Sequence, residues 1–304
     1  MSLIRKLFFK DNKITTFCIT RLTANKVVEK VFLKKGRYKT EITKHHGMIC
    51  LDPFCIAVWL PAGEANEIDP QTATILFESD NHLNASIEAT LIESKPTEQG
   101  VLFLYSIRKV KNYQLTILHR LLLLRYFLRS KKNTYRHRKV ISALYSYPRN
   151  IIIVSYKDNS YYNIFPMDIR SYIEEEKLYL LGLRTTNITL EKILSAGKVV
   201  VCDTDTVDIN TVYTLGKHPS ADPTKIQDLP FKVTESKMFG FYVPDFTGSY
   251  KEIRIIDHKK MGYHMLLIGK VVNEEQIKPD SASLYHVGFL QFQTGHYKNI
   301  EGLY

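Results

Sequence analysis

The feature that most constrains the fold is a succession of short segments rich in Val, Ile, Thr, Tyr and Phe, separated by turn-forming residues. Over the first third of the chain these segments lie at 14–20, 26–33, 48–60, 72–78, 86–93 and 101–107. Between them stand Gly36, Pro61-Ala62-Gly63 and Asp69-Pro70, and such residues favour turns. Because β-branched and aromatic residues favour strands, the pattern predicts a small antiparallel β domain.

The second half repeats this pattern after a change of periodicity. Apolar residues at helical spacing run over 113–128, which predicts a connecting helix. Further strands are predicted at 150–156, 161–165, 177–183, 199–202, 231–234, 252–257, 264–273 and 287–293. A short helix over 190–196 is expected to end at Gly197, since glycine adopts the left-handed conformation without strain. This order predicts a mostly antiparallel barrel with few short helices.

Length and charge together predict two domains. The chain has 304 residues, whereas one domain usually has about 100–200. Residues 1–140 carry 24 Lys and Arg against 12 Asp and Glu, whereas residues 141–304 carry 18 against 19. This asymmetry predicts a basic β-rich domain with its connecting helix over 1–140, and a barrel over 141–304.

The densest basic cluster lies at 129–139, where Arg and Lys alternate with Tyr135 and His137. Such a cluster is suited to an anionic partner, either a nucleic acid or a membrane surface. It is equally typical of the solvated end of a helix. The sequence leaves both interpretations open.

Several classes of protein are disfavoured. Four cysteines in a chain of this length do not suggest a disulfide framework, so a reducing cytoplasmic setting is expected. The longest apolar run, 121–124, is far shorter than the roughly 20 residues that span a bilayer. Cys50 and Cys55 lie in an apolar segment without ligands at zinc-like spacing, so no metal site is expected. Neither dinucleotide nor P-loop motifs are present.

One segment carries a candidate binding site. Residues 183–189, Leu-Arg-Thr-Thr-Asn-Ile-Thr, lie between a predicted strand and a predicted helix. Free backbone N–H groups at the helix start, a guanidinium and several hydroxyls suit a phosphate monoester. The same residues are also suited to a plain helix cap by Asn187 or Thr189.

Taken in order, several segments of the second half resemble a known family. They are 147–155 (YPRNIIIVS), 162–168 (YNIFPMD), 183–189, 198–201 (KVVV), 262–271 (GYHMLLIGKV) and 286–297 (HVGFLQFQTGHY). Residues 147–300 thereby resemble the flavin reductase-like family, which has an FMN-binding split barrel. The resemblance implies a Greek-key barrel, a homodimer and bound FMN.

The resemblance also implies roles for particular residues. A loop along the flavin ring is expected at Asn163, Ile164, Phe165, Pro166 and Met167. The ribityl phosphate is expected at Arg184, Thr185, Thr186, Asn187 and Thr189. His264 stands where many members have a histidine on the nicotinamide side of the flavin, although Tyr263 replaces the usual aspartate before it. A histidine satisfied by local hydrogen bonds in a strand is the alternative for His264.

The function implied is an FMN-dependent oxidoreductase that uses NAD(P)H to reduce flavin or a small acceptor. Hydride transfer occurs at the flavin itself, so no catalytic triad is required of the protein. The alternative is a flavin-binding or nucleic-acid-associated module without turnover, in which the basic residues 129–139 matter more than the barrel. A β protein of another role is the third possibility.

Overall fold

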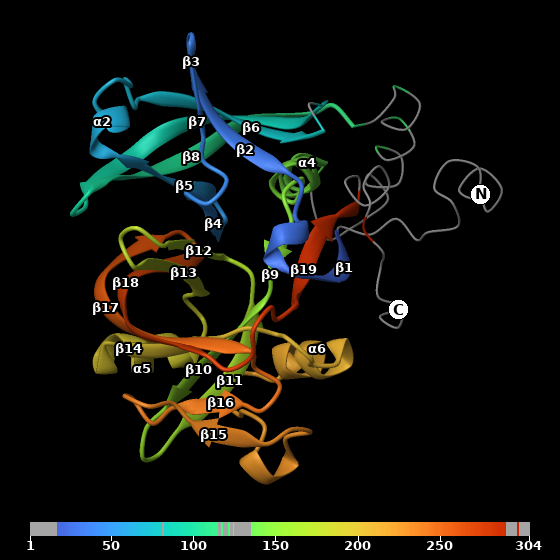
Figure 1. The fold of residues 1–304 in the computed structure, drawn as a ribbon, viewed down its shortest axis with the longest axis vertical. Coiled ribbons are helices and arrows are strands. Elements are labelled where there is room, and N and C mark those ends of the chain that lie inside the picture. The colour runs from blue at the N-terminus through green and yellow to red at the C-terminus, as the bar shows by residue number, and fades with distance from the viewer. Residues whose placement is uncertain are drawn as a thin grey trace, which may run out of the picture.

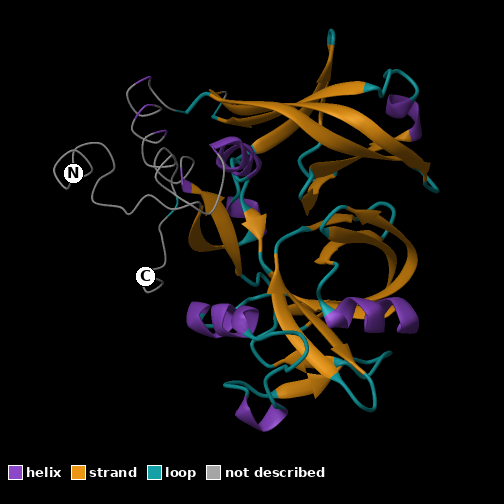
Figure 2. Ribbon diagram, turned by 180° about the vertical axis from the view of Figure 1, so that it is seen from behind, coloured by secondary structure: helices purple, strands orange, loops and turns teal. Residues whose placement is uncertain are grey.

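The computed structural model describes residues 17–80, 82–114 and 135–289, together with positions 117, 121, 124 and 297. These residues form mainly antiparallel strands with few short helices (Figure 2). Two seven-stranded sheets, one from each half of the chain, lie one above the other in Figure 1. The predicted mainly β fold is therefore confirmed.

The N-terminal sheet has the strand order β3-β2-β6-β7-β8-β5-β4, and every neighbouring pair is antiparallel. Leu33, Phe77 and Ile87 are fully buried on its core side. The 3₁₀ turn η1 (Ala24–Lys26) precedes the first strand of this sheet. The short helix α2 (Ala62–Ala65) connects its strands β5 and β6. Its strands are β2 (Lys30–Lys35), β3 (Tyr38–Glu41), β4 (His46–Leu51), β5 (Phe54–Pro61), β6 (Thr72–Ser79), β7 (His82–Pro96) and β8 (Gly100–Asn112).

Helix α4 (Tyr135–Leu144) closes the core of this half. It packs against β7 and β8, and its Val140, Ile141 and Leu144 are buried in the same cluster as Ile87. The domain boundary predicted near residue 140 falls inside this helix. The division of the chain into two domains at this point stays a prediction.

The second sheet has the order β11-β10-β14-β17-β18-β13-β12 and curls into a split barrel (Figure 1). Ile153, Val200 and Leu267 are fully buried inside it, so the barrel has an apolar core of its own. Its strands are β10 (Ile152–Lys157), β11 (Tyr162–Met167), β12 (Arg170–Ile173), β13 (Leu178–Arg184), β14 (Lys198–Cys202), β17 (Ser249–Met261) and β18 (His264–Gln276).

Two helices pack on the barrel. Helix α5 (Ile188–Ala196) is capped by Asn187 and ends at Gly197, whose φ of 64° confirms the predicted left-handed cap. Helix α6 (Ile209–Lys217) begins at Asp208, whose carboxylate accepts the N–H groups of Asn210 and Thr211. The turn η2 (Ile226–Asp228) and the hairpin of β15 (Val233–Glu235) and β16 (Tyr242–Pro244) follow.

A third sheet joins the two halves. It has the order β1-β19-β9, formed by β1 (Phe17–Leu22), β19 (Ser283–Gly288) and β9 (Arg149–Asn150). The first described strand of the chain is thus paired with the last, with Phe17 opposite Gly288 and Leu22 opposite Ser283.

The two large sheets also meet directly, because β4 lies against β12, β13 and β18. Ile49 and Cys50 share a buried cluster with side chains of the barrel, including Leu180 and Leu266. The backbones approach closely at Gly182, where a Cβ atom would lie 2.4 Å from the Ile49 carbonyl oxygen. Glycine is required there because any side chain would push the sheets apart.

Some predicted elements were wrong. Residues 48–60 are two strands, β4 and β5, joined by a turn at Asp52-Pro53. Residues 163–167, which the resemblance implies to be a loop, lie in strand β11, in agreement with the strand that the sequence pattern predicts over 161–165. The strand predicted over 26–33 begins only at Lys30. The helix predicted over 113–128, residues 14–16 of the first predicted strand and residues 290–293 of the last lie wholly or mostly outside the described residues.

The Gly182→Ala variant is expected to lower the free energy of unfolding by about 1–3 kcal/mol, because the added methyl group overlaps the backbone of β4. Chemical denaturation measures this change. Gly63→Ala is the matched control: a Cβ there meets nothing within 4 Å, so its stability should be unchanged or slightly higher. Equal stabilities for the two variants would contradict this account of the sheet contact.

Candidate functional site

The structure brings the two segments of the predicted cofactor site together. Asn163 lies on β11, at the edge of the barrel sheet, and Thr189 lies in the first turn of α5. The Asn163 side-chain amide donates to Thr189 Oγ1 at 2.8 Å, and both side chains are buried. The two segments that the resemblance assigns to one cofactor are thus in contact, whereas their cofactor roles stay a prediction.

This contact is one link in a longer hydrogen-bonded chain. Thr189 Oγ1 lies 2.7 Å from the Tyr161 hydroxyl, which donates to the Ser220 carbonyl oxygen at 2.7 Å. Since the Tyr161 proton goes to Ser220, the Thr189 hydroxyl donates to Tyr161 and accepts from Asn163. In the described conformation Thr189 is fully engaged by protein groups.

The start of α5 is likewise satisfied from within the chain. The Ile188 N–H donates to Ser220 Oγ at 3.0 Å, and the Thr189 N–H donates to Asn187 Oδ1 at 3.0 Å. Arg184 and Thr186 are exposed, whereas Thr185 donates to the Tyr263 carbonyl through its backbone and its hydroxyl. The corner therefore has the predicted capping geometry, with Asn187 as the cap, and Ser220 accepts a backbone N–H at the helix start.

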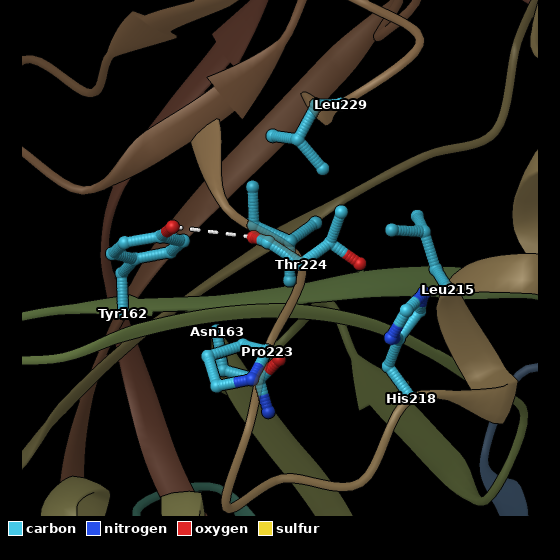
Figure 3. Close-up of a pocket in the computed structure, with 8 residues that line it drawn as sticks. Tyr162, Asn163, Leu215, His218, Pro223, Thr224 and Leu229 are labelled. Atoms are coloured by element: carbon cyan, nitrogen blue, oxygen red, sulfur yellow. Dashed lines mark hydrogen bonds between the residues drawn. The ribbon is translucent and has the colours of Figure 1, made fainter. Parts of the chain in front are cut away.

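A small pocket lies beside β11, and Figure 3 shows the side chains around it. Its lining includes Tyr162 and Asn163 of β11 with Pro223 beside them, and Leu215 with His218 on the opposite side. The Tyr162 hydroxyl donates to the Thr224 carbonyl oxygen at 3.2 Å, which holds the 223–229 segment against the strand. The volume is about 10 Å³, so the described conformation has no room here for three fused rings.

His264, the predicted catalytic residue, lies beside Arg184 in the β13–β18 pairing. Its ring is buried and faces the N-terminal sheet, where Nδ1 lies 3.4 Å from Cys50 Sγ. Its Nε2 atom is buried without a hydrogen-bond partner. The pKa of the Cys50 thiol is lowered, chiefly by its hydrogen bond with Cys55 and then by His264.

Sequence reasoning missed a second group of buried polar residues. The Asp168 carboxylate accepts from the Tyr145 hydroxyl at 2.5 Å and pairs with His286 Nδ1 at 2.7 Å. The other nitrogen of His286 lies 2.7 Å from the Tyr213 hydroxyl. Burial raises the pKa of Asp168, but His286 and Tyr145 outweigh it and hold the pKa below its usual range. Asp168 and His286 lie in segments that carry the resemblance, but the resemblance implies no role for them. Four separate parts of the chain contribute the group, so no single motif or spacing brings its members together.

Arg149 and His46 form the other part of this group. His46 Nδ1 lies 3.0 Å from the Ile42 carbonyl oxygen and 3.1 Å from that of Thr43, so this nitrogen carries the proton. His46 Nε2 then accepts from the Arg149 guanidinium at 3.2 Å. Burial, followed by the charge of Arg149, lowers the pKa of His46 to about 3, so the imidazole is neutral.

Other kinds of site find no support in the described part of the chain. Among these residues no cluster of three or more His, Cys, Asp or Glu is arranged to hold a metal ion. No helix within them combines the length and apolar character needed to cross a bilayer.

Comparison with known proteins returns solved structures only. No protein-family model and no curated protein matches the chain. An FMN-binding protein from Thermus thermophilus is 17% identical with a TM-score of 0.39, covering 43% of this chain and 72% of its own. An NADH:FAD oxidoreductase from Streptomyces globisporus is 12% identical with a TM-score of 0.45, covering 57% and 96%.

Flavoredoxin from Methanosarcina acetivorans is also similar, with 13% identity, a TM-score of 0.40 and coverage of 46% of this chain and 86% of its own. At these identities and TM-scores the likeness is limited to the course of the chain over about half of its length. No ligand or activity follows from it.

The Thr189→Val variant is expected to destabilise the protein by about 1–3 kcal/mol, because it leaves the buried Asn163 amide without its acceptor and removes the hydrogen bond that the Tyr161 hydroxyl accepts. Thr186→Val, at an exposed position of the same segment, should change the stability by less than about 0.5 kcal/mol. Urea denaturation compares the two. A stable Thr189→Val variant would show that this hydroxyl does not hold the segments together.

The buried His46 predicts a particular pH dependence. The unfolded chain binds a proton at His46 near pH 6.5, whereas the folded protein does so only near pH 3. The free energy of unfolding should therefore fall as the pH falls from about 6.5 towards 3. Urea denaturation at pH 7.5 and pH 5 should show a smaller fall for His46→Gln than for the wild type. His218→Gln, at an exposed histidine, should keep the wild-type fall.

Proposed function

We propose that this chain is a flavin-binding oxidoreductase that holds FMN through its phosphate at the start of α5. The proposal is supported by the corner formed by Arg184, Asn187 and Thr189, where an exposed guanidinium stands beside a helix N-terminus. Helix N-termini and arginine side chains both suit phosphate oxygens. Asn163 connects this corner to the strand proposed for the ring.

The ring is proposed to lie along the Asn163–Met167 part of β11. Because β11 is an edge strand, alternate backbone N–H and C=O groups point away from β10. Bound there, the flavin supplies the hydride chemistry, and the protein supplies position and hydrogen bonds. His264 is included in the proposed site because it is paired with Arg184 across β13 and β18. In the described conformation, however, its ring contacts Cys50.

Binding in this way requires a rearrangement. The 218–229 segment covers β11, and Ser220 takes the Ile188 N–H that the phosphate would need. The segment is held there by the hydroxyls of Tyr161 and Tyr162, besides Ser220 itself. Flavin binding is thus proposed to displace residues 218–229 from the edge of the barrel.

NAD(P)H as reductant, a small molecule as acceptor, the homodimer and the cytoplasmic setting belong to the same proposal. The alternative is a binding module without turnover whose basic residues 129–139 bind nucleic acid. Most of those residues lie outside the described part of the chain. Aerobic consumption of NAD(P)H with added FMN supports the oxidoreductase. Flavin binding without consumption, or salt-dependent binding of oligonucleotides, supports the module.

The Arg184→Ala variant is expected to weaken FMN binding at least tenfold, because a charged hydrogen bond to phosphate contributes about 1.5–3 kcal/mol. Fluorescence titration of FMN measures the affinity, and thermal unfolding should be unchanged because Arg184 is exposed. Arg254→Ala, at an exposed arginine of β17, is the matched control and should bind FMN as the wild type does.

Ser220→Ala tests the required rearrangement. It removes the hydroxyl that competes for the Ile188 N–H, so FMN should bind about 2–10 times more tightly. If Arg184→Ala binds FMN like the wild type, or no variant binds it at all, the phosphate site is not at this corner.

A further inference from the structure

A larger cavity lies between the two halves of the chain, away from the proposed flavin corner. Its volume is about 300 Å³, which falls at the lower end of the range for small-molecule sites. Both halves contribute to it. Its walls include Lys44 and His46 at the entry to β4, Arg149 and Asn150 of β9, Arg170 and Tyr172 of β12, and Tyr285 of β19.

Arg149 gives this cavity a buried positive charge. The residue is only 5% exposed, and it forms no ion pair with any described residue. Its Nε and one terminal nitrogen donate to the Leu144 carbonyl oxygen at 3.2 and 3.0 Å. Its other terminal nitrogen donates to the neutral His46. A guanidinium has five N–H donors, so two are left after these three bonds.

Arg170 supplies a second guanidinium in the cavity wall. It lies over the Tyr179 ring, 6.0 Å from its centroid, and it too forms no ion pair among the described residues. The two arginines repel each other: burial first, and Arg170 to a smaller extent, lower the pKa of Arg149. An anion between them would relieve this repulsion, because opposite charges in a partly buried site attract strongly.

The acidic residues of the cavity form no ion pair with either arginine, although the charge of Asp168 acts to raise the pKa of Arg149. Asp168 is engaged by His286 and Tyr145, and Glu174 is exposed at the mouth, where Lys44 is exposed as well. The Asn150 side-chain oxygen is buried without a hydrogen-bond partner. A ligand that donates a hydrogen bond to this atom would be favoured, because a buried acceptor without a partner costs free energy.

We propose that this cavity binds a small organic molecule through a phosphate or carboxylate group held between Arg149 and Arg170. The oxyanion accepts the two remaining N–H groups of Arg149 and those of Arg170. The body of the molecule lies against the rings of Tyr147, Tyr172 and Tyr285, and a donor on it pairs with the Asn150 oxygen. No residue of this cavity belongs to the proposed flavin site, so each proposal can be tested independently of the other.

The test measures ligand affinity by isothermal titration calorimetry on the full chain with three probes: phenyl phosphate, benzoate and phenol. The wild type is expected to bind phenyl phosphate, benzoate or both, and to bind phenol at least tenfold more weakly. Binding of phenyl phosphate alone assigns the phosphate ester, and binding of benzoate alone assigns the carboxylate. No binding of either anion at millimolar concentration, or equal binding of phenol, overturns the proposal.

Variants locate the binding. Arg170→Met should weaken the binding of the anion at least tenfold, and Arg170→Lys should restore part of it, because the charge returns without the planar fork. Arg254→Met, at an exposed arginine elsewhere on the barrel, is the matched control. Arg170 is only partly buried, so its variants are expected to fold, which thermal unfolding checks. Wild-type affinity in Arg170→Met overturns the site.

Discussion

The close contact between β4 and the barrel is the constraint on which the rest of the arrangement depends. Gly182 and Gly47 allow the two backbones to approach, and a Cβ at Gly47 would lie 2.4 Å from that of Ser171. This approach turns His264 towards Cys50 and brings His46 to Arg149. The cavity between the halves is lined by His46 of β4 and by Arg170 and Ser171 of β12, so this packing shapes part of its wall.

Much of the fold was predictable from local sequence. Alternating apolar residues and turn signals located most strands, and Asn187 with Gly197 marked both ends of α5. The failures have physical causes. The run 48–60 is apolar except for Asp52, because both β4 and β5 are largely buried, and a single Asp-Pro pair does not reveal the turn between them. Short strands such as β12 carry too few residues to show a period.

Part of the candidate sites was also predictable from the sequence, and part was not. Asn163 and Thr189 were both singled out from the sequence, although their contact was not predicted, and nothing in the sequence marks Ser220, which accepts from the first residue of α5. The cluster of Arg149, His46 and Asp168 is assembled from three distant parts of the chain. Its chemistry arises from burial and from the fixed tautomer of His46, and only the folded structure shows these properties.

The pairing of β1 with β19 has a mechanical consequence. Phe17 lies opposite Gly288, so both strands leave the pair towards the chain ends on the same side. A force that separates the two strands at Phe17 and Gly288 would break their hydrogen bonds one after another, starting from that end of the pair. Because these hydrogen bonds would break singly, the β1–β19 pair would resist such a force less than two strands pulled along their length.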